Sequence, residues 1–494
     1  MQLKWLRNAE RRLIMDNKCT YRYLSRFVIE AETPLVVGSG DKDITTDALV
    51  ATDVNGLPYI PGTAIAGVVR HAFDEIEKEQ DPEAFINRED KDKKSSFFGY
   101  QIFKEPKDSK GSEIIFSEAK MVGKDGIVID GLQSIDWSDI FYSHFKVLPI
   151  RQHVSIDERG AAKDKGKFDE QIVYKGTRFC FEIEMDSDAS NFDKFKKVLA
   201  FLLSGSFRIG SGIHSGFGKI KIVSCKEKEL DLNNKDDLSL YLKKSSSLAD
   251  DWEGWDDYEY QGNTKDNVWI KYDLTLKPQD FFLFGSGLGD ADANMTPVRE
   301  SVIVWKEGKP EFEDNYVLIP ATSVKGALAH RSAYYYNKAN HFFADNLSKD
   351  EIQKYIGSNN IAVETLFGSE EKRDKDNNII KNQKRGNVIF SDIIEKNDGF
   401  TDKLINHVSI DRFTGGAIDG ALFTEKAVYG KGREFRTTLM VNSSAFKTEK
   451  VEESFEAALF DLCSGMLPLG GGVNRGNGVF EGTIMKNGTI IYPK

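Results

Sequence analysis

The chain has 494 residues, of which 40% are hydrophobic, and a formal net charge of −11 at pH 7. This length predicts two or more cores, and the acidic balance excludes wholesale non-specific binding to nucleic acid, which needs a broad basic surface. No apolar run is long enough to cross a bilayer. The four cysteines form no CxxC pair, which argues against a disulfide framework or a thiolate zinc site, so we expect a reducing cytoplasm.

The chain carries the same ordered set of motifs twice. The shared motifs are a GSG triplet (38–40, 285–287), a proline motif before a helix (59–73, 318–332), an IFS segment (114–119, 388–393), HVSID (153–157, 407–411) and a glycine-rich loop (202–218, 462–478). An ordered recurrence of this kind predicts an internal duplication. We expect a first domain over 1–225 and a second over 267–494. An acidic linker should join them over 226–266, where 12 acidic residues outnumber 6 basic ones.

Each repeat begins with alternating apolar residues, over 19–38 and 268–285, which predict a half-buried strand. A loop leads to the proline motif, where Thr63 and Thr322 stand at the expected N-cap of a helix. The helix is followed in both repeats by a polar insertion rich in Lys, Asp and Glu.

HVSID opens the next segment of each repeat. Two strand-like arms surround a polar, glycine-rich tip near 158–171 and 412–424, which predicts a protruding hairpin. A helix, the glycine loop and a last strand complete the unit. This order predicts an α+β fold of two tandem ferredoxin-like, or RRM-like, domains, each with an inserted hairpin. The apolar residues of the two HVSID motifs are expected in the strand cores: Val154, Ile156, Val408 and Ile410.

The glycine loops have the spacing GxGxxxGxG, which matches neither the dinucleotide fingerprint nor a phosphate loop. They also follow a helix and precede a strand, the reverse of both. Two interpretations stay open. The glycines could serve only a tight turn with positive φ, or they could let a polyanion backbone approach main-chain N–H groups beside Arg208, His214 and Arg475.

The ordered motifs resemble the RAMP superfamily of CRISPR proteins. The segments that carry the likeness best are "TTDALVATDVNGLPYIPGT" (45–63) and "VSIDRFTGGAIDGALF" (408–423). The chain looks most like the backbone, Cas-seven-type subunits of type III (Csm- or Cmr-like) effectors. Its two copies resemble the fused double-RAMP subunits of type III-D, and the likeness covers both halves.

This resemblance implies a role in antiviral defence. RRM-like domains would lie along a guide (CRISPR) RNA, the hairpins would be thumbs in the guide–target duplex, and HVSID would form the thumb bases. The implied partners are the guide RNA, complementary target RNA and other RAMP subunits. The implied RNA-binding residues are Thr63, Arg70, Arg208, Gly210, Gly212, His214, Gly216, Lys325, Arg331, Gly470, Gly472 and Arg475.

The resemblance also implies an endoribonuclease site. Family members cleave target RNA with a loop aspartate upstream of the proline motif and a divalent cation such as Mg²⁺, and Asp47 matches that position, with Asp53 six residues on. In the second repeat the register falls on Met295, with Asp292 and Asp290 close by. Asp47 and Asp292 are therefore the candidate catalytic residues.

Two other functions remain open from the sequence. The chain could be a scaffold that binds guide RNA without cutting, or a RAMP endonuclease that processes precursor guide RNA. The second of these usually needs a histidine base, and His71 and His330 are the repeated candidates, although we expect them to be buried or capping residues. Neither insertion, about 79–112 and 369–387, contains a cysteine, so no zinc site is expected.

Overall fold

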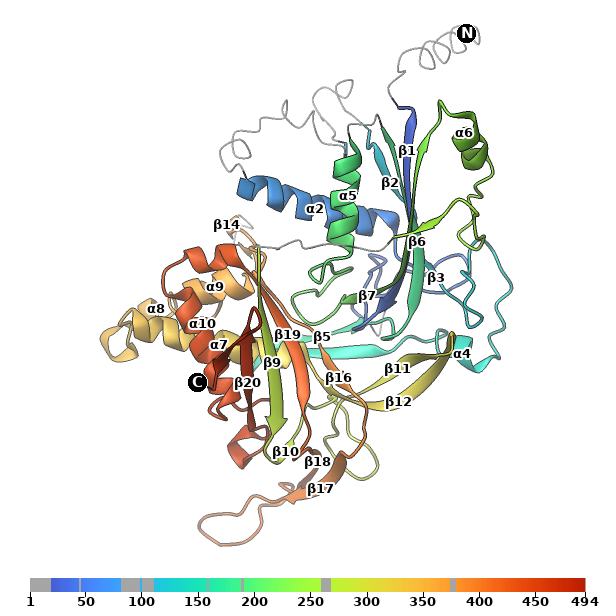
Figure 1. Cartoon of the computed structure of the whole chain (residues 1–494). Helices are drawn as coiled ribbons and strands as arrows, with labels where there is room; N and C mark the ends of the chain where they lie inside the picture. The colour runs from blue at the N-terminus through green and yellow to red at the C-terminus, as the bar shows by residue number, and fades with distance from the viewer. Residues whose placement is uncertain are drawn as a thin grey trace.

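The computed structural model contains two α+β domains that follow one another along the chain (Figure 1). In each domain, helices cover one face of an antiparallel sheet and a long hairpin leaves the sheet (Figure 1). The structure describes residues 19–43, 46–80, 98–99, 111–157, 160–187, 191–258, 268–373 and 379–493. In this part of the chain no helix is long and apolar enough to cross a membrane.

The first domain has a sheet in the order β2-β6-β1-β7-β8, with β3 also paired to β6. Its main elements are β1 (Tyr21–Ala31), α2 (Gly62–Gln80), β2 (Ile114–Phe116), β3 (Lys120–Met121), α4 (Ile140–Ser143), β6 (Arg178–Ser187), α5 (Phe192–Leu202) and β7 (Ile220–Asp231). The chain order β1-α2-β2-β6-α5-β7 and the spatial order of its four strands are those of a ferredoxin-like unit, as the sequence predicts.

The second domain repeats this plan with the sheet order β15-β19-β9-β20-β21. Its corresponding elements are β9 (Trp269–Pro278), α7 (Ala321–Ala339), β15 (Val388–Ile389), β19 (Phe435–Asn442), α10 (Val451–Cys463) and β20 (Phe480–Lys486). The remaining elements are β10 (Phe281–Phe282), β11 (Arg299–Lys306), β12 (Lys309–Ile319), α8 (Lys349–Ile352), α9 (Ile361–Phe367), β13 (Lys372–Arg373), β14 (Ile379–Lys381), β16 (Ile393–Glu395) and β21 (Thr489–Tyr492), with short 3₁₀ turns at 344–346, 357–359, 443–447 and 473–475.

The two cores form because alternate strand residues face the helices. In β1, Tyr23, Phe27 and Ile29 are fully buried, and in β9 Tyr272 and Leu274 take the same place. Each core is completed by apolar residues of the helix before the glycine loop, such as those of α5 and α10. The two clusters are separate, although Ile303 of β11 in the second domain packs into the first cluster.

The first sheet extends into the segment expected to be a linker. Strand β7 runs to Asp231, α6 (Lys235–Leu242) follows, and β8 (Asp256–Asp257) pairs with β7. Trp252 is buried against Leu24 and Leu230 on the sheet face that α2 and α5 leave open. The described residues 226–258 thus belong to the first domain, because scattered apolar side chains in this acidic segment find a sheet face to cover. Residues 259–267 lie outside the described residues.

Each domain carries the expected hairpin. In the first, β4 (Ile150–Ile156) pairs with β5 (Ala162–Gln171); in the second, β17 (Thr401–His407) pairs with β18 (Phe423–Tyr429) around a long loop. The second hairpin protrudes at the bottom of Figure 1. The expectation of buried HVSID side chains is wrong, because these side chains lie toward the tip of each hairpin, away from the cores. Val154, Ile156, Val408 and Ile410 are all about half exposed.

The expected helix caps are also wrong. Helix α2 begins at Gly62 and α7 at Ala321, so Thr63 and Thr322 are the second residues of their helices. The N-cap of α7 is Pro320, which has no capping side chain. Instead Asp392, from the turn between β15 and β16, accepts a hydrogen bond of 2.8 Å from the Ala321 N–H. A residue distant in sequence therefore replaces the local cap.

A buried ionic cluster joins the domains. Arg151, in β4 of the first hairpin, donates to Asp392 and Glu300 of the second domain. Burial lowers the pKa of Arg151, but the two carboxylates outweigh it and raise that pKa above its usual value. Burial also raises the pKa of Glu300. Gly216 packs against Asp392 and Ala321, where no Cβ would fit, so the first glycine loop touches the same point.

Candidate nucleic-acid interface

A pocket of about 590 Å³ lies where the N-terminal end of α2, the first glycine loop and the second domain meet. Its first-domain lining includes Thr63, His71, Arg208 and Gly210, and its second-domain lining includes Trp269 and Arg385. The pocket thus brings together three of the predicted RNA-binding residues. The free N–H groups at a helix N-terminus and a neighbouring guanidinium are suited to an anionic group such as a phosphate.

Arg208 is the most confined cation of this pocket. It is 4% exposed, and its Nη1 donates to the carbonyls of Gly205 (2.7 Å) and Phe207 (3.0 Å). Its Nε is buried and has no hydrogen-bond partner among the described residues. Burial lowers the pKa of Arg208 to about 10, only slightly offset by Glu32. A buried donor without an acceptor is costly, so an anion in the pocket would complete this guanidinium's environment.

The glycines of the two loops perform the same steric tasks in each domain. Gly210 and Gly470 have φ of +92° and +86°, and each lies against a carbonyl of the adjoining segment, Val36 or Leu283, where a Cβ would clash. Gly212 and Gly472 also have positive φ, of +67° and +71°. The tight-turn interpretation is therefore confirmed, while RNA contact by these glycines stays a prediction.

His214 faces the second domain. Its Nδ1 lies 2.8 Å from the carbonyl of Val388 and its Nε2 accepts from Arg385 Nε at 2.9 Å. The pKa of His214 is lowered to about 4, mainly by burial. Arg385 and Lys325 also lower it, and the hydrogen bond to the Val388 carbonyl opposes them. Burial also lowers the pKa of Lys325. His214 and Lys325 thus lie at the domain interface, which their sequence motifs do not indicate.

The two HVSID histidines have one structural role. His153 Nε2 lies 3.0 Å from Glu170 Oε1 across the first hairpin, and its ring stacks on Phe168 with a centroid distance of 4.9 Å. His407 repeats both contacts with Glu425 (3.0 Å) and Phe423 (4.8 Å). The motif therefore recurs because each hairpin base needs the same cross-strand contact.

The other predicted cations are spread over the second domain and α2. Arg475 binds the fully buried Glu425 with 2.7 Å between Nη2 and Oε2, and its side chain is 36% exposed. Arg331 pairs with Asp461 at 3.3 Å and donates to the Met466 carbonyl. Arg70 and both helix histidines, His71 and His330, are exposed, so the expectation that the histidines are buried or capping is wrong.

Asp47 lies on the surface at the base of the first hairpin. Its N–H donates to Asp169 Oδ1 (3.0 Å), and the Asp169 N–H donates to Asp47 Oδ2 (3.2 Å). Asp53 instead stabilises its own turn, accepting from the N–H groups of Asn55 and Leu57. Asp169 is a neighbour that the sequence motifs did not single out; only the hairpin pairing places it beside Asp47.

The register of the second repeat differs by one residue from the sequence expectation. Ala48 forms a parallel bridge with Glu170, and the matching bridge joins Met295 to Glu425. The structural counterpart of Asp47 is therefore Asn294 and not Met295. The sequence comparison failed here because the two loops differ in length and only the strand contacts fix their alignment.

Asp292 and Asp290 lie nearby and share one cation. Lys426 Nζ lies 3.2 Å from Asp292 Oδ2 and closer to Asp290. The Asp292 side chain is 70% exposed. The hydrogen bond from Lys426 is the main cause of the lowered pKa of Asp290. Asp292 is thus accessible, but a lysine partly neutralises its charge.

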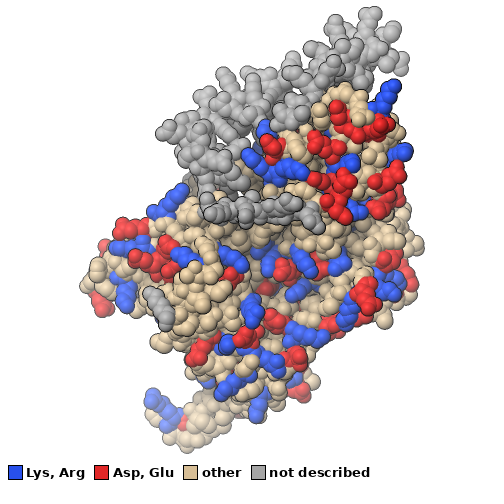
Figure 2. All heavy atoms as spheres, viewed as in Figure 1, with Lys and Arg blue, Asp and Glu red and all other residues tan. Residues whose placement is uncertain are grey.

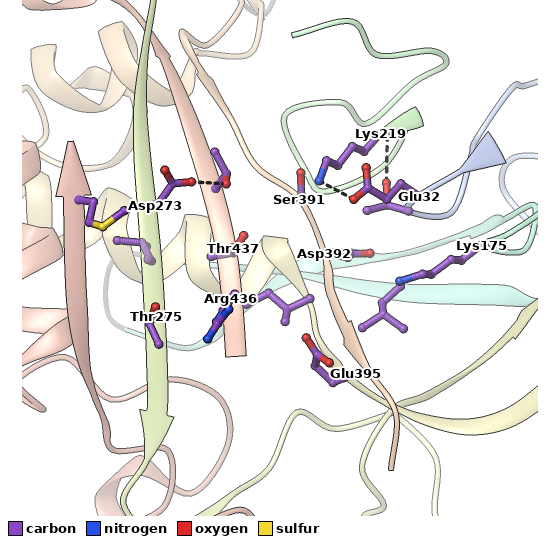
Figure 3. Close-up of a pocket in the computed structure, with 16 residues that line it drawn as sticks. Glu32, Lys175, Lys219, Asp273, Thr275, Ser391, Asp392, Glu395, Arg436 and Thr437 are labelled. Atoms are coloured by element: carbon purple, nitrogen blue, oxygen red, sulfur yellow. Dashed lines mark hydrogen bonds and ion pairs between the residues drawn. The ribbon is translucent and has the colours of Figure 1, made fainter. Parts of the chain in front are cut away.

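The seam between the domains holds another pocket, of about 500 Å³ (Figure 3). Glu32, Lys175 and Lys219 of the first domain line it opposite Asp273 and Arg436 of β9 and β19. Lys219 pairs with Glu32 at 2.8 Å, and Asp273 accepts from the Thr438 hydroxyl at 2.7 Å. Carboxylates line this pocket beside its cations, and Lys219 is already paired, so this pocket is less suited to an RNA phosphate than the one at Arg208.

Basic and acidic side chains alternate over the described residues of the face in Figure 2, with acidic ones gathered near α6 and β7. This agrees with the net charge of −11. Contacts to an RNA backbone would therefore come from local sites such as the Arg208 pocket and not from a continuous basic surface.

The described residues contain no group of three or more His, Cys, Asp or Glu side chains placed to hold a metal ion. The exposed carboxylate of Asp47 nevertheless fits a cation that is shared with a substrate, since Mg²⁺ is commonly held by one or two carboxylates together with phosphate oxygens. The chemistry of this side chain is thus compatible with the divalent ion that the resemblance implies.

A comparison with protein families gives a match to the RAMP superfamily in two separate regions, residues 28–221 and 283–481. A comparison with curated proteins found no match. Each matched region covers most of one ferredoxin-like unit, with its hairpin and glycine loop, in agreement with the duplicated fold. The first region begins within β1, and the second begins after β9. The chain therefore belongs to the RAMP superfamily, as two tandem RAMP domains, in a family of RNA-binding subunits of CRISPR complexes.

Proposed function

We propose that this protein is a backbone subunit of a type III-like CRISPR effector, which binds guide RNA and cleaves complementary target RNA. The observation that supports RNA binding most directly is the pocket in which the buried Arg208 guanidinium lies near the N-terminal end of α2. Two RAMP domains in one chain would bind successive segments of one guide. The protruding hairpins, with half-exposed apolar residues, have the shape and surface of thumbs that separate segments of a duplex.

For cleavage, we assign the main role to Asp47. An exposed carboxylate with a fixed orientation could accept the proton of the target 2′-hydroxyl, which would then attack the adjacent phosphate. A divalent cation held by Asp47 together with the phosphate oxygens would neutralise charge on the phosphate. Asp292 remains the candidate of the second repeat, although Lys426 competes for its charge.

The test uses the guide-loaded complex and a labelled complementary RNA. Asp47→Ala should remove one set of cleavage products while target affinity changes little. Asp41→Ala, at another exposed aspartate of the same loop, is the matched control. EDTA should stop cleavage and largely spare binding. Full cleavage by Asp47→Ala would show that the chain is a scaffold in this reaction.

A processing endonuclease is the other function that one observation favours, because the exposed His71 lines the Arg208 pocket. In that case His71→Ala, and not Asp47→Ala, would stop the trimming of a precursor guide RNA. Uniform guide RNA in a complex that carries His71→Ala would exclude this function.

A further inference from the structure

The loop before each proline motif is fixed to its hairpin by a reciprocal pair of hydrogen bonds, which we call the clasp. In the first repeat the clasp joins Asp47 and Asp169, with distances of 3.0 and 3.2 Å. In the second it joins Asn294 and Thr424: the Asn294 N–H donates to Thr424 Oγ1 (3.2 Å), and the Thr424 N–H donates to Asn294 Oδ1 (2.8 Å).

The two clasps are equivalent in the fold. Asp47 precedes Ala48, which bridges to Glu170, and Asn294 precedes Met295, which bridges to Glu425. In both repeats the hairpin partner directly precedes the glutamate that contacts the HVSID histidine. The loop residue is exposed in both copies, and its partner is partly buried. The clasp therefore holds the side chain at position 47 or 294 in one orientation relative to the hairpin.

The chemistry of the two clasps differs. The first consists of two carboxylates, whose like charges repel, while the second uses an amide and a hydroxyl. The second loop is fixed by these neutral side chains together with a main-chain hydrogen bond of 2.9 Å from the Asn294 N–H to the Thr424 carbonyl. Holding the loop therefore does not require the carboxylate of Asp47, and this carboxylate is left for the reaction. At residue 169 the clasp requires only a hydrogen-bond acceptor.

Resting on the function proposed above, we propose that Asp169 is the positioning residue of Asp47. We also propose that the clasp of the second repeat is inactive because Asn294 replaces the carboxylate, so that any cutting by this repeat would depend on Asp292. A neutral amide cannot accept the 2′-hydroxyl proton, whereas Thr424 already supplies the positioning contact. A single substitution, Asn294→Asp, should then give the second repeat the arrangement of the first.

The experiment compares Asp169→Ala, which removes the side-chain acceptor of the clasp and keeps the main-chain N–H of residue 169, with Asp169→Thr, which restores an acceptor with the residue found in the second repeat. Single-turnover cleavage and target affinity are measured in the guide-loaded complex, with thermal unfolding as the folding control. Asp169→Ala should slow cleavage by about 100-fold, the cost of misplacing a reacting group. Asp169→Thr should cleave at nearly the rate of the unchanged complex, and affinity should be the same in both variants.

Equal loss in both variants would overturn the positioning role, because the Asp169 carboxylate itself would then be needed. Unchanged cleavage in Asp169→Ala would overturn it as well. Asn294→Asp should yield an additional cleavage product at a second position of the target, and its absence in a complex that binds target normally would contradict the inference for the second repeat. The Asp47→Ala variant distinguishes failure of the proposed function from failure of the positioning role. If a complex with Asp47→Ala cleaves normally, the proposed function is wrong, whatever the Asp169 variants do.

Discussion

His153 and Glu170 lie 3.0 Å apart, Nε2 to Oε1, across the base of the first hairpin. The same relationship recurs between His407 and Glu425, with the same distance. The two glutamates differ in burial, since the Glu170 side chain is 16% exposed and that of Glu425 is fully buried. Glu425 also binds Arg475 and lies 3.3 Å from Asn477 Nδ2. In this polar network Glu425 and Asn477 are buried, whereas His407 and Arg475 are partly exposed.

Glu425→Ala should therefore lower the free energy of unfolding by about 2 kcal/mol, because it leaves the buried amide of Asn477 without its acceptor. Chemical denaturation of the full chain measures this. Glu434→Ala removes a carboxylate from an exposed pair with Lys277 and should leave the free energy of unfolding nearly unchanged. Equal losses in the two variants would contradict the importance of burial at Glu425.

Arg151→Ala should destabilise the contact between the domains by about 3–5 kcal/mol, since Glu300 and Asp392 then stay buried without their cation. Urea unfolding, with small-angle scattering to detect domain separation, provides the measurement. The stability lost in Arg151→Ala should be smaller at acid pH. Burial raises the pKa of Glu300, so the folded state binds its proton more readily than the unfolded state. Arg436→Ala, at a side chain that is 79% exposed, is the control.

The domain interface should weaken as pH falls from about neutral toward 4. Burial is the main cause that lowers the pKa of His214 from 6.5 to about 4. Between these two pH values the imidazole is protonated in the unfolded chain and neutral in the folded chain. The stabilisation is therefore present above 6.5 and lost as pH falls toward 4. His214→Gln should flatten the dependence of the melting temperature on pH in this range. His330→Gln, at an exposed position of α7, should leave it unchanged.

Arg70→Ala should lower RNA affinity and reduce the slope of log affinity against log salt by about 1, as expected for one lost phosphate contact. Arg70 is exposed on α2, so folding should not change. Filter binding of the guide RNA over a series of salt concentrations measures both quantities. Lys243→Ala, whose side chain is 63% exposed beside α6, is the matched control. An unchanged slope in Arg70→Ala would remove this residue from the interface.

Chymotrypsin should cut the free chain first in the loop of the second hairpin, after Phe413, whose side chain is 92% exposed. Guide and target RNA should protect this bond if the hairpin enters the duplex. Mass spectrometry of the fragments identifies the site, and Phe413→Ser should abolish that fragment. The same cleavage rate with and without RNA would argue against a thumb.

The sequence by itself determined the duplicated ferredoxin-like units, the hairpins and the glycine turns. These features depend on local patterns: alternation of apolar residues makes a strand such as β1, and positive φ requires glycine at 210 and 470. The repeated HVSID motif also corresponds to a repeated structural feature, a histidine that contacts a glutamate across the hairpin. The glutamate lies on the opposite strand, so this contact could not be predicted from the motif.

Only the tertiary structure decided how residues distant along the chain combine. It buried Arg208 in a pocket, turned His214 toward the second domain, and replaced the expected threonine cap of α7 with Asp392. It also aligned Asn294 with Asp47, because strand bridges fix register where loops of unequal length do not. Local propensity acts over a few residues, whereas burial and pairing depend on contacts between segments that the chain order alone does not place together.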